Sequence, residues 1–134
     1  MKGYTKFFII ASILYFVLGT LLGTLFFFRP TLLALKPVHV HLNLLGFLSM
    51  MVYGVLYHVL PRFLARPLYS EWLAWFHVIA GNLTFVLLLG LMALGYGGGS
   101  SEALAWAKWA ALAHWLTILA FAYNILQTIR LASS

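Results

Sequence analysis

The stretch FFIIASILYFVLGTLLGTLFFF, residues 7–28, runs for 22 positions without a charged side chain. A helix needs about 20 mostly apolar residues to cross the hydrocarbon core of a bilayer, so this stretch alone predicts a membrane-spanning helix. It is too long for the apolar core of a secretory signal, and no small-x-small cleavage pattern follows it. We therefore expect it to remain in the mature protein.

Three further apolar stretches follow, and together they predict spans at 6–28, 38–60, 72–94 and 103–130. Proline, glycine and charged residues predict breaks over 29–37, 61–67 and 95–101. The composition agrees, because 64% of the 134 residues are hydrophobic and only 7% are charged, against about a quarter charged in soluble domains. We expect residues 1–134 to form one all-α domain, an integral membrane four-helix bundle in the lipid bilayer.

Lysine and arginine residues near the helix ends predict the orientation of the bundle. One end collects the larger set, which is Lys2, Lys6, Arg62, Arg66 and Arg130. The other end holds Arg29, Lys36 and Lys108. By the positive-inside rule, both termini are expected on the cytoplasmic side of a prokaryotic-type inner (cytoplasmic) membrane. The basic residues are scattered singly, which is not the pattern of a nucleic-acid-binding protein.

Histidine is the residue type most able to carry chemistry here, since the chain has five histidines and no cysteine. At about 1.5 Å per residue, His41 and His114 fall in the outer half of the bundle and His58 and His77 in the inner half. Either pair could hold a haem between two imidazoles. We favour His41 and His114, because a buried imidazole in apolar surroundings needs a partner. His77, His58 and His39 are the alternatives, although His39 and His58 lie near helix ends, where interfacial histidines are ordinary.

Four other residues are predicted to contribute to a cofactor site. Asn43 and Tyr53 lie in the second span and indicate a polar-lined or cofactor-lined interior. Arg29 and Lys36 lie in the outer loop that leads to His41. Their charges would suit haem propionates, and lipid phosphates are an equally ordinary partner.

The segment from Pro37 to Arg62 resembles the second helix of the catalytic subunit (subunit I) of heme-copper oxidases. The likeness is closest to the C-type oxidases and the bacterial nitric oxide reductases. The residues that carry it are His41-Leu-Asn43, Gly54, Tyr57 and Pro61. Residues 68–76 are similar to the start of the third helix in the C-type enzymes.

The resemblance implies that His41 is a ligand of a low-spin haem b. In those families the second ligand and the oxygen- or nitric-oxide-reducing centre lie on later helices, which this chain does not include. A complete oxidase or reductase is therefore not expected. The opposite ligand is expected to be local, with His114 preferred and His77 or His41 of a second copy as alternatives.

Two functions of different classes follow. The first is a b-type haem protein with one haem toward the outer face, for electron transfer or for gas or redox sensing, or with two haems if His58 and His77 hold another. The second is a haem-free partner or assembly subunit of a larger membrane complex. Metal handling by His39-x-His41 is a weaker third option.

A redox partner or quinol and a homodimer are the expected partners. The only carboxylate side chains, Glu71 and Glu102, give little support for an enzyme.

Overall fold

The computed structural model describes residues 1–132 as a chain of helical segments. In order these are α1 (Gly3–Phe28), η1 (Pro30–Leu35), α2 (Lys36–His41), η2 (Leu42–Ser49), α3 (Met50–Phe63), α4 (Glu71–Met92), η3 (Ala93–Gly97) and α5 (Ser101–Ala132). The η1 segment is a 3-10 helix, whereas η2 and η3 are wider π-helical segments. None of these 132 residues lies in a strand.

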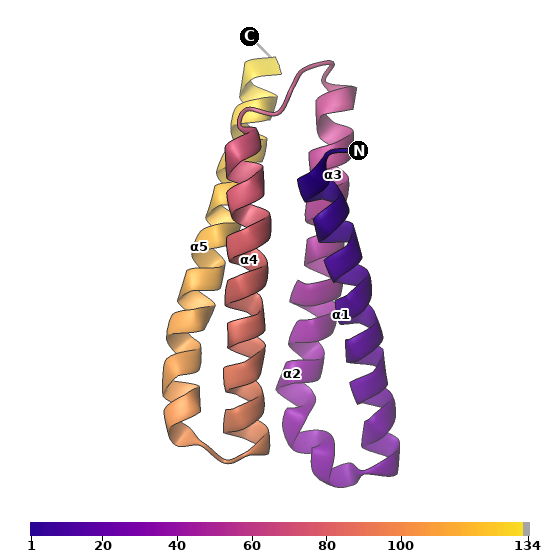
Figure 1. Ribbon diagram of the computed structural model, residues 1–134, viewed down its shortest axis with the longest axis vertical. Helices are drawn as coiled ribbons and strands as arrows, with labels where there is room; N and C mark the ends of the chain where they lie inside the picture. Colours follow the sequence, from indigo (N-terminus) through magenta and orange to yellow (C-terminus); the bar gives the residue numbers. More distant parts are fainter. Residues whose placement is uncertain (133–134) are drawn as a thin grey trace.

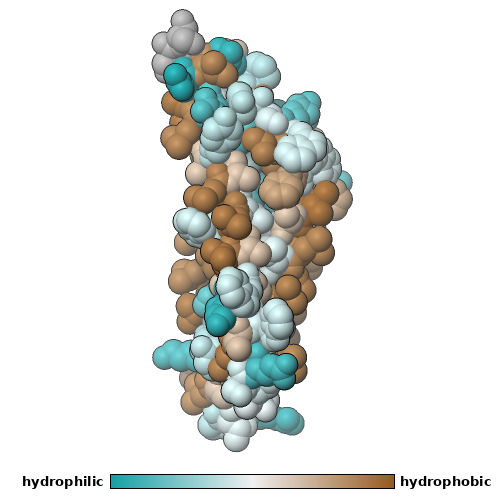
Figure 2. All heavy atoms as spheres, turned by 90° about the vertical axis from the view of Figure 1, so that its left-hand side faces the viewer, coloured by the Kyte–Doolittle hydropathy of each residue, from teal (hydrophilic) through white to brown (hydrophobic). Residues whose placement is uncertain are grey.

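The segments join into four long rods, Gly3–Phe28, Pro30–Phe63, Glu71–Gly97 and Ser101–Ala132. Each rod is long and apolar enough to cross a membrane, which confirms the prediction of an all-helical chain with four such helices. On the face turned toward the viewer in Figure 2, apolar residues cover much of the middle and hydrophilic residues gather mainly toward the two ends. This distribution suits a bundle surrounded by lipid.

The four rods are arranged as two hairpins (Figure 1). One hairpin is α1 with α2, η2 and α3, and the other is α4 with α5. Both chain ends and the α3–α4 connection lie at one end of the bundle, here named the terminal end. The η1 segment and the turn before α5 lie at the opposite end, here named the turn end.

Two helix ends lie later than the sequence predicts. α3 continues through Pro61 to Phe63, because a proline in the last turn of a helix removes only one backbone hydrogen bond. The chain then reverses at Ala65, whose φ of 48° is left-handed. η3 continues through Gly97, and there the glycines serve close packing, because a Cβ at Gly95 would collide with Leu104.

Small residues allow close contacts between the helices. In α1, Gly19 and Gly23 make room for η2 and α2, because a Cβ at Gly19 would lie 2.8 Å from the Asn43 side chain and one at Gly23 would lie 2.7 Å from the His39 ring. In α5, Ala107 and Ala110 are buried. Their neighbours Ala105, Ala111 and Ala113 are exposed or only partly buried. The pattern follows helical spacing, because only one face of α5 meets its neighbours.

The α3–α4 connection is held against α5 at the terminal end. The side chain of Asn124 is fully buried, and its Oδ1 accepts from Ser70 N at 3.0 Å while its Nδ2 donates to Ser70 O at 2.8 Å. Thr128 Oγ1 accepts from Tyr69 N at 3.0 Å. Ser70 itself caps α4, because its Oγ accepts from Leu73 N at 3.2 Å. A short polar clamp therefore fixes the covalent link between the hairpins.

We expect Asn124→Ala to lower the stability of the purified protein by about 2 kcal/mol or more, because both backbone groups of Ser70 would lose their buried partner. The measurement is the thermal unfolding midpoint in detergent, determined by fluorescence-detected size-exclusion chromatography. Gln127→Ala removes the other side-chain amide of α5 and serves as the matched control. Equal midpoints for the two variants would contradict the clamp.

Candidate functional site

The interior of the bundle contains polar side chains that meet between the hairpins. His77 and His114 are 1% and 4% exposed, and Thr117 beside them is also buried. His77 lies on α4 and His114 on α5, and the backbone at Gly81 runs past both. Because water is absent from a bilayer core, each of these polar groups needs a partner from the protein.

His114 has its ring fixed by α4. Its Nδ1 lies 3.2 Å from Thr84 Oγ1, and a further hydrogen bond joins the ring to the backbone of Gly81. Thr84 already donates its hydroxyl hydrogen to Ala80 O at 2.7 Å. The hydroxyl oxygen therefore accepts from His114, which places the ring hydrogen on Nδ1 and leaves Nε2 with a lone pair.

His41 has the same arrangement on the other hairpin. Its Nδ1 lies 2.8 Å from Pro37 O, one turn earlier, and a carbonyl oxygen can only accept. The hydrogen is again on Nδ1, so Nε2 is the nitrogen that can bind a metal. His41 is half-buried, and it lies near enough to His114 for the charges of the two rings to interact. The wide η2 segment begins directly after it, and π-helical segments are frequent at functional sites.

His77 is enclosed by aromatic side chains. The rings of Phe8 and Tyr53 have centroids 4.8 Å from that of His77, and Phe121 follows at 5.5 Å. Tyr57 OH lies 3.2 Å from His77 Nδ1. The side chain of Asn124 lies close to the Tyr57 hydroxyl.

The hydrogen bond with Tyr57 bears on which ring nitrogen of His77 carries the hydrogen. A tyrosine hydroxyl has one hydrogen to donate and can also accept. With Tyr57 as the donor, the ring hydrogen of His77 is on Nε2. His41 differs, because its Nδ1 faces a carbonyl oxygen that can only accept.

The two remaining histidines lie nearer the ends of the bundle. His39 donates from Nδ1 to Gly19 O at 2.8 Å and contacts the Phe26 ring edge-on at 5.5 Å. His58 is partly exposed at the terminal end, where its Nδ1 lies 2.8 Å from Arg62 Nη1. Both therefore have local partners. Within residues 1–132, His, Cys, Asp and Glu side chains form no group of three that could hold a metal ion.

The four predicted cofactor-binding residues lie in different places. Arg29 and Lys36 are exposed at the turn end, and Lys36 is in the first turn of the rod that carries His41. The Nδ2 of Asn43 donates to His39 O at 2.8 Å, so it supports His39. Tyr53 packs on His77 and on Phe121, with ring centroids 4.5 Å apart in the latter pair.

The contact between Thr84 and His114 and the enclosure of His77 were not found from the sequence. Phe8 and Phe121 are ordinary apolar residues in apolar spans, so nothing distinguishes them before the helices are placed in space. Tyr15 OH donates to Asn82 Oδ1 at 2.8 Å, which likewise joins residues 67 positions apart. Polar residues in the middle of a span indicated interior contacts. The partner of each residue depends on how the helices are rotated about their axes, which the sequence does not specify.

Comparison with known proteins leaves the family of the chain open. No protein-family model, curated protein or solved structure matches it.

Proposed function

We propose that the protein is a b-type haem protein of the membrane, with His41 and His114 as the axial ligands of one haem. The observation that carries the proposal is that the two rings, on different hairpins, have the same hydrogen-bond arrangement at Nδ1. Each ring has an oxygen atom within hydrogen-bond distance of Nδ1, Pro37 O or Thr84 Oγ1, so that Nε2 remains for a metal. His39 Nδ1 has such a partner too, Gly19 O, but the His39 ring packs against Gly23 and Phe26 of α1 within its own hairpin. Ligating histidines in proteins nearly always have such an outer hydrogen bond, because it fixes both tautomer and ring orientation.

The positions of the two residues support the same proposal. His41 belongs to one hairpin and His114 to the other, as two ligands on opposite faces of a ring require. Phe85 lies against the His114 ring, with centroids 5.4 Å apart, and supplies apolar surroundings. Arg29 and Lys36 are the cations nearest in sequence to His41 at the turn end, and we assign them to the propionates.

Iron with two histidine ligands has no open coordination position. We therefore assign electron transfer to this protein in preference to gas binding. When bound, the haem supplies one-electron chemistry, and the protein supplies the ligands, their hydrogen bonds and a low-dielectric interior that sets the potential. In this proposal the two imidazoles serve as iron ligands and have no acid–base role.

The charge pattern supports a location in a prokaryotic-type cytoplasmic membrane. The larger basic set comprises Lys2 and Lys6 at the start of α1, Arg62 and Arg66 around the end of α3, and Arg130 near the end of α5. These helix ends all lie at the terminal end (Figure 1). We infer that the terminal end faces the cytoplasm and that the haem lies toward the other side.

We expect His41→Ala and His114→Ala each to lose most of the haem, because each removes one ligand. His39→Ala and His58→Ala should keep it, since the His39 ring packs against α1 of its own hairpin and His58 lies at the terminal end beside Arg62. The measurement is haem per chain by the pyridine haemochrome assay and the reduced-minus-oxidised spectrum, on detergent-purified protein expressed with haem supply. Full haem in His41→Ala would refute the assignment, and a wild-type chain without haem would favour a haem-free partner subunit.

We expect Thr84→Val to weaken haem binding by about tenfold, because the variant keeps the shape but removes the oxygen that orients His114. Thr84→Ser should restore both affinity and midpoint potential. Thr20→Val is the matched control, since Thr20 is exposed on α1 and its hydroxyl bonds only to carbonyls of its own helix. The readouts are a haem titration of the apo-protein and a redox titration. Equal affinities for Thr84→Val and Thr20→Val would show that Thr84 does not position the ligand.

A further inference from the structure

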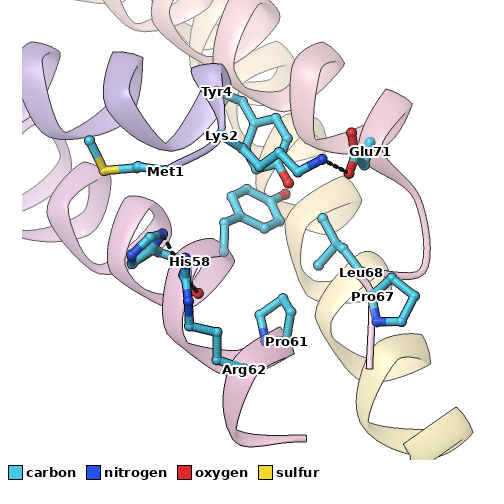
Figure 3. Close-up of a pocket in the computed structure, with 10 residues that line it drawn as sticks. Met1, Lys2, Tyr4, His58, Pro61, Arg62, Pro67, Leu68 and Glu71 are labelled. Atoms are coloured by element: carbon cyan, nitrogen blue, oxygen red, sulfur yellow. Dashed lines mark hydrogen bonds and ion pairs between the residues drawn. The ribbon is translucent and has the colours of Figure 1, made fainter. Parts of the chain in front are cut away.

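A cavity of about 410 Å³ opens at the terminal end, away from His41 and His114. It lies between the start of α1, the end of α3 and the connection to α4 (Figure 3). Its walls are formed by Met1, Lys2, Tyr4, Tyr57, His58, Pro61, Arg62, Pro67, Leu68 and Glu71. We name it the Tyr57 pocket. Its volume falls within the range of small-molecule sites, about 300–1,000 Å³.

The inner wall of the pocket is aromatic and firmly packed. Tyr4 and Tyr57 are each 2% exposed, and their rings meet edge to face with centroids 5.7 Å apart. Trp75 supports Tyr4 from behind, again edge to face at 5.8 Å. A flat ring placed against this wall would meet side chains that are already ordered, so little conformational entropy would be lost on binding.

The rim of the pocket is polar and carries a net positive charge. Lys2 Nζ lies 2.7 Å from Glu71 Oε1, an ion pair that Figure 3 shows across one side of the pocket. Arg62 Nη1 donates to His58 O at 2.6 Å and meets His58 Nδ1 at 2.8 Å, so its charge faces a neutral group. The amino group of Met1 adds a further positive charge. Such a rim offers hydrogen-bond donors to a ligand with oxygen acceptors.

The Tyr57 pocket is connected to the buried core. The hydroxyl of Tyr57 bonds to His77 Nδ1 at 3.2 Å. Gly81 lies against both His77 and Thr117, and Thr117 Oγ1 donates to His114 O at 2.7 Å. The pocket wall is therefore the outermost member of the polar groups that lead toward the proposed haem ligands.

We infer that the Tyr57 pocket binds the head group of a membrane-soluble quinone. The ring would lie against Tyr4 and Tyr57, and the ring oxygens would accept from Arg62 and Lys2. A ligand of this class is flat, has oxygen acceptors and is carried in lipid, which matches an aromatic pocket with hydrogen-bond donors at its rim and helices apolar enough to span a membrane. The binding claim stands without haem, and only the choice of a redox-active ligand rests on the proposed function.

The test is photolabelling of the full-length protein in nanodiscs with an azido-quinone, followed by mass spectrometry of the labelled peptides. We expect label on residues 1–4 or 57–71, and loss of that label when excess decylubiquinone is added. Loss of label with phosphatidylglycerol but not with decylubiquinone would assign the pocket to an anionic lipid and overturn the inference. Label spread over the lipid-facing surface would also overturn it.

Two pocket variants and one control variant make the test specific. Leu68→Trp fills the pocket and should abolish the label, whereas Leu83→Trp places the same ring in the lipid-facing groove between α1 and α4 and should leave it unchanged. Arg62→Gln removes a donor from an exposed position and should weaken the label without unfolding the protein. Label that persists in both Leu68→Trp and Arg62→Gln would refute the site.

The labelling is run on both the apo-protein and the haem-supplied protein. A chain that contains no haem but is labelled in the pocket would contradict the haem proposal and keep the quinone site. A chain that contains haem but is not labelled in the pocket would contradict the quinone site and keep the haem proposal.

Discussion

The absence of water from the bilayer interior is the constraint on which this structure depends. Polar groups inside the bundle are costly unless they find a partner in another helix or in their own backbone. Thr5 Oγ1 is the exception among the described residues, since it is buried without a hydrogen-bond partner. His41 uses Pro37 O, His114 uses Thr84 Oγ1, and His77 uses the hydroxyl of Tyr57. The same requirement acts at the terminal end, where Asn124 satisfies both backbone groups of Ser70. Ring orientation throughout the bundle is thus decided by hydrogen bonding, since lipid exerts no such preference.

Apolar packing then determines how near these groups come to one another. Gly46 in η2 sits against Tyr15 and Phe85, and a Cβ there would lie 2.8 Å from Tyr15 Cβ and 2.9 Å from Phe85 Cε1. This close approach brings the hairpin of His41 up to Phe85, which in turn lies on the ring of His114. On the terminal side, large aromatic rings fill the space between the hairpins around His77. One half of the bundle is held by close backbone contact and the other by bulky side chains.

The sequence was most informative about the helices, because the length and apolarity of a span are enough to predict one. The length and apolarity of each span predicted four long helices, and they are present, because a charge-free run such as residues 7–28 has few alternatives in a bilayer. The ends of α3 and η3 were harder to predict, because Pro61 and Gly95 break helices only in some contexts. Pairings such as Thr84 with His114 could not be predicted, since they depend on the rotation of α4 and α5 about their axes. In the second rod, η2 also changes which faces of α2 and α3 are aligned, because a π-helical turn contains more residues than an α-helical one.

The polar clamp at the terminal end has a consequence for how the molecule is assembled. Residues 64–70 are the single covalent link between the hairpins, and Asn124 and Thr128 hold part of that link against α5. The opposite end, where His41 lies, has no such link across the hairpins. At that end the hairpins are joined by packing alone, as where Leu35 of η1 lies against Gly97 of η3. Weakening this packing would therefore let the hairpins part at the turn end while the terminal end stays joined.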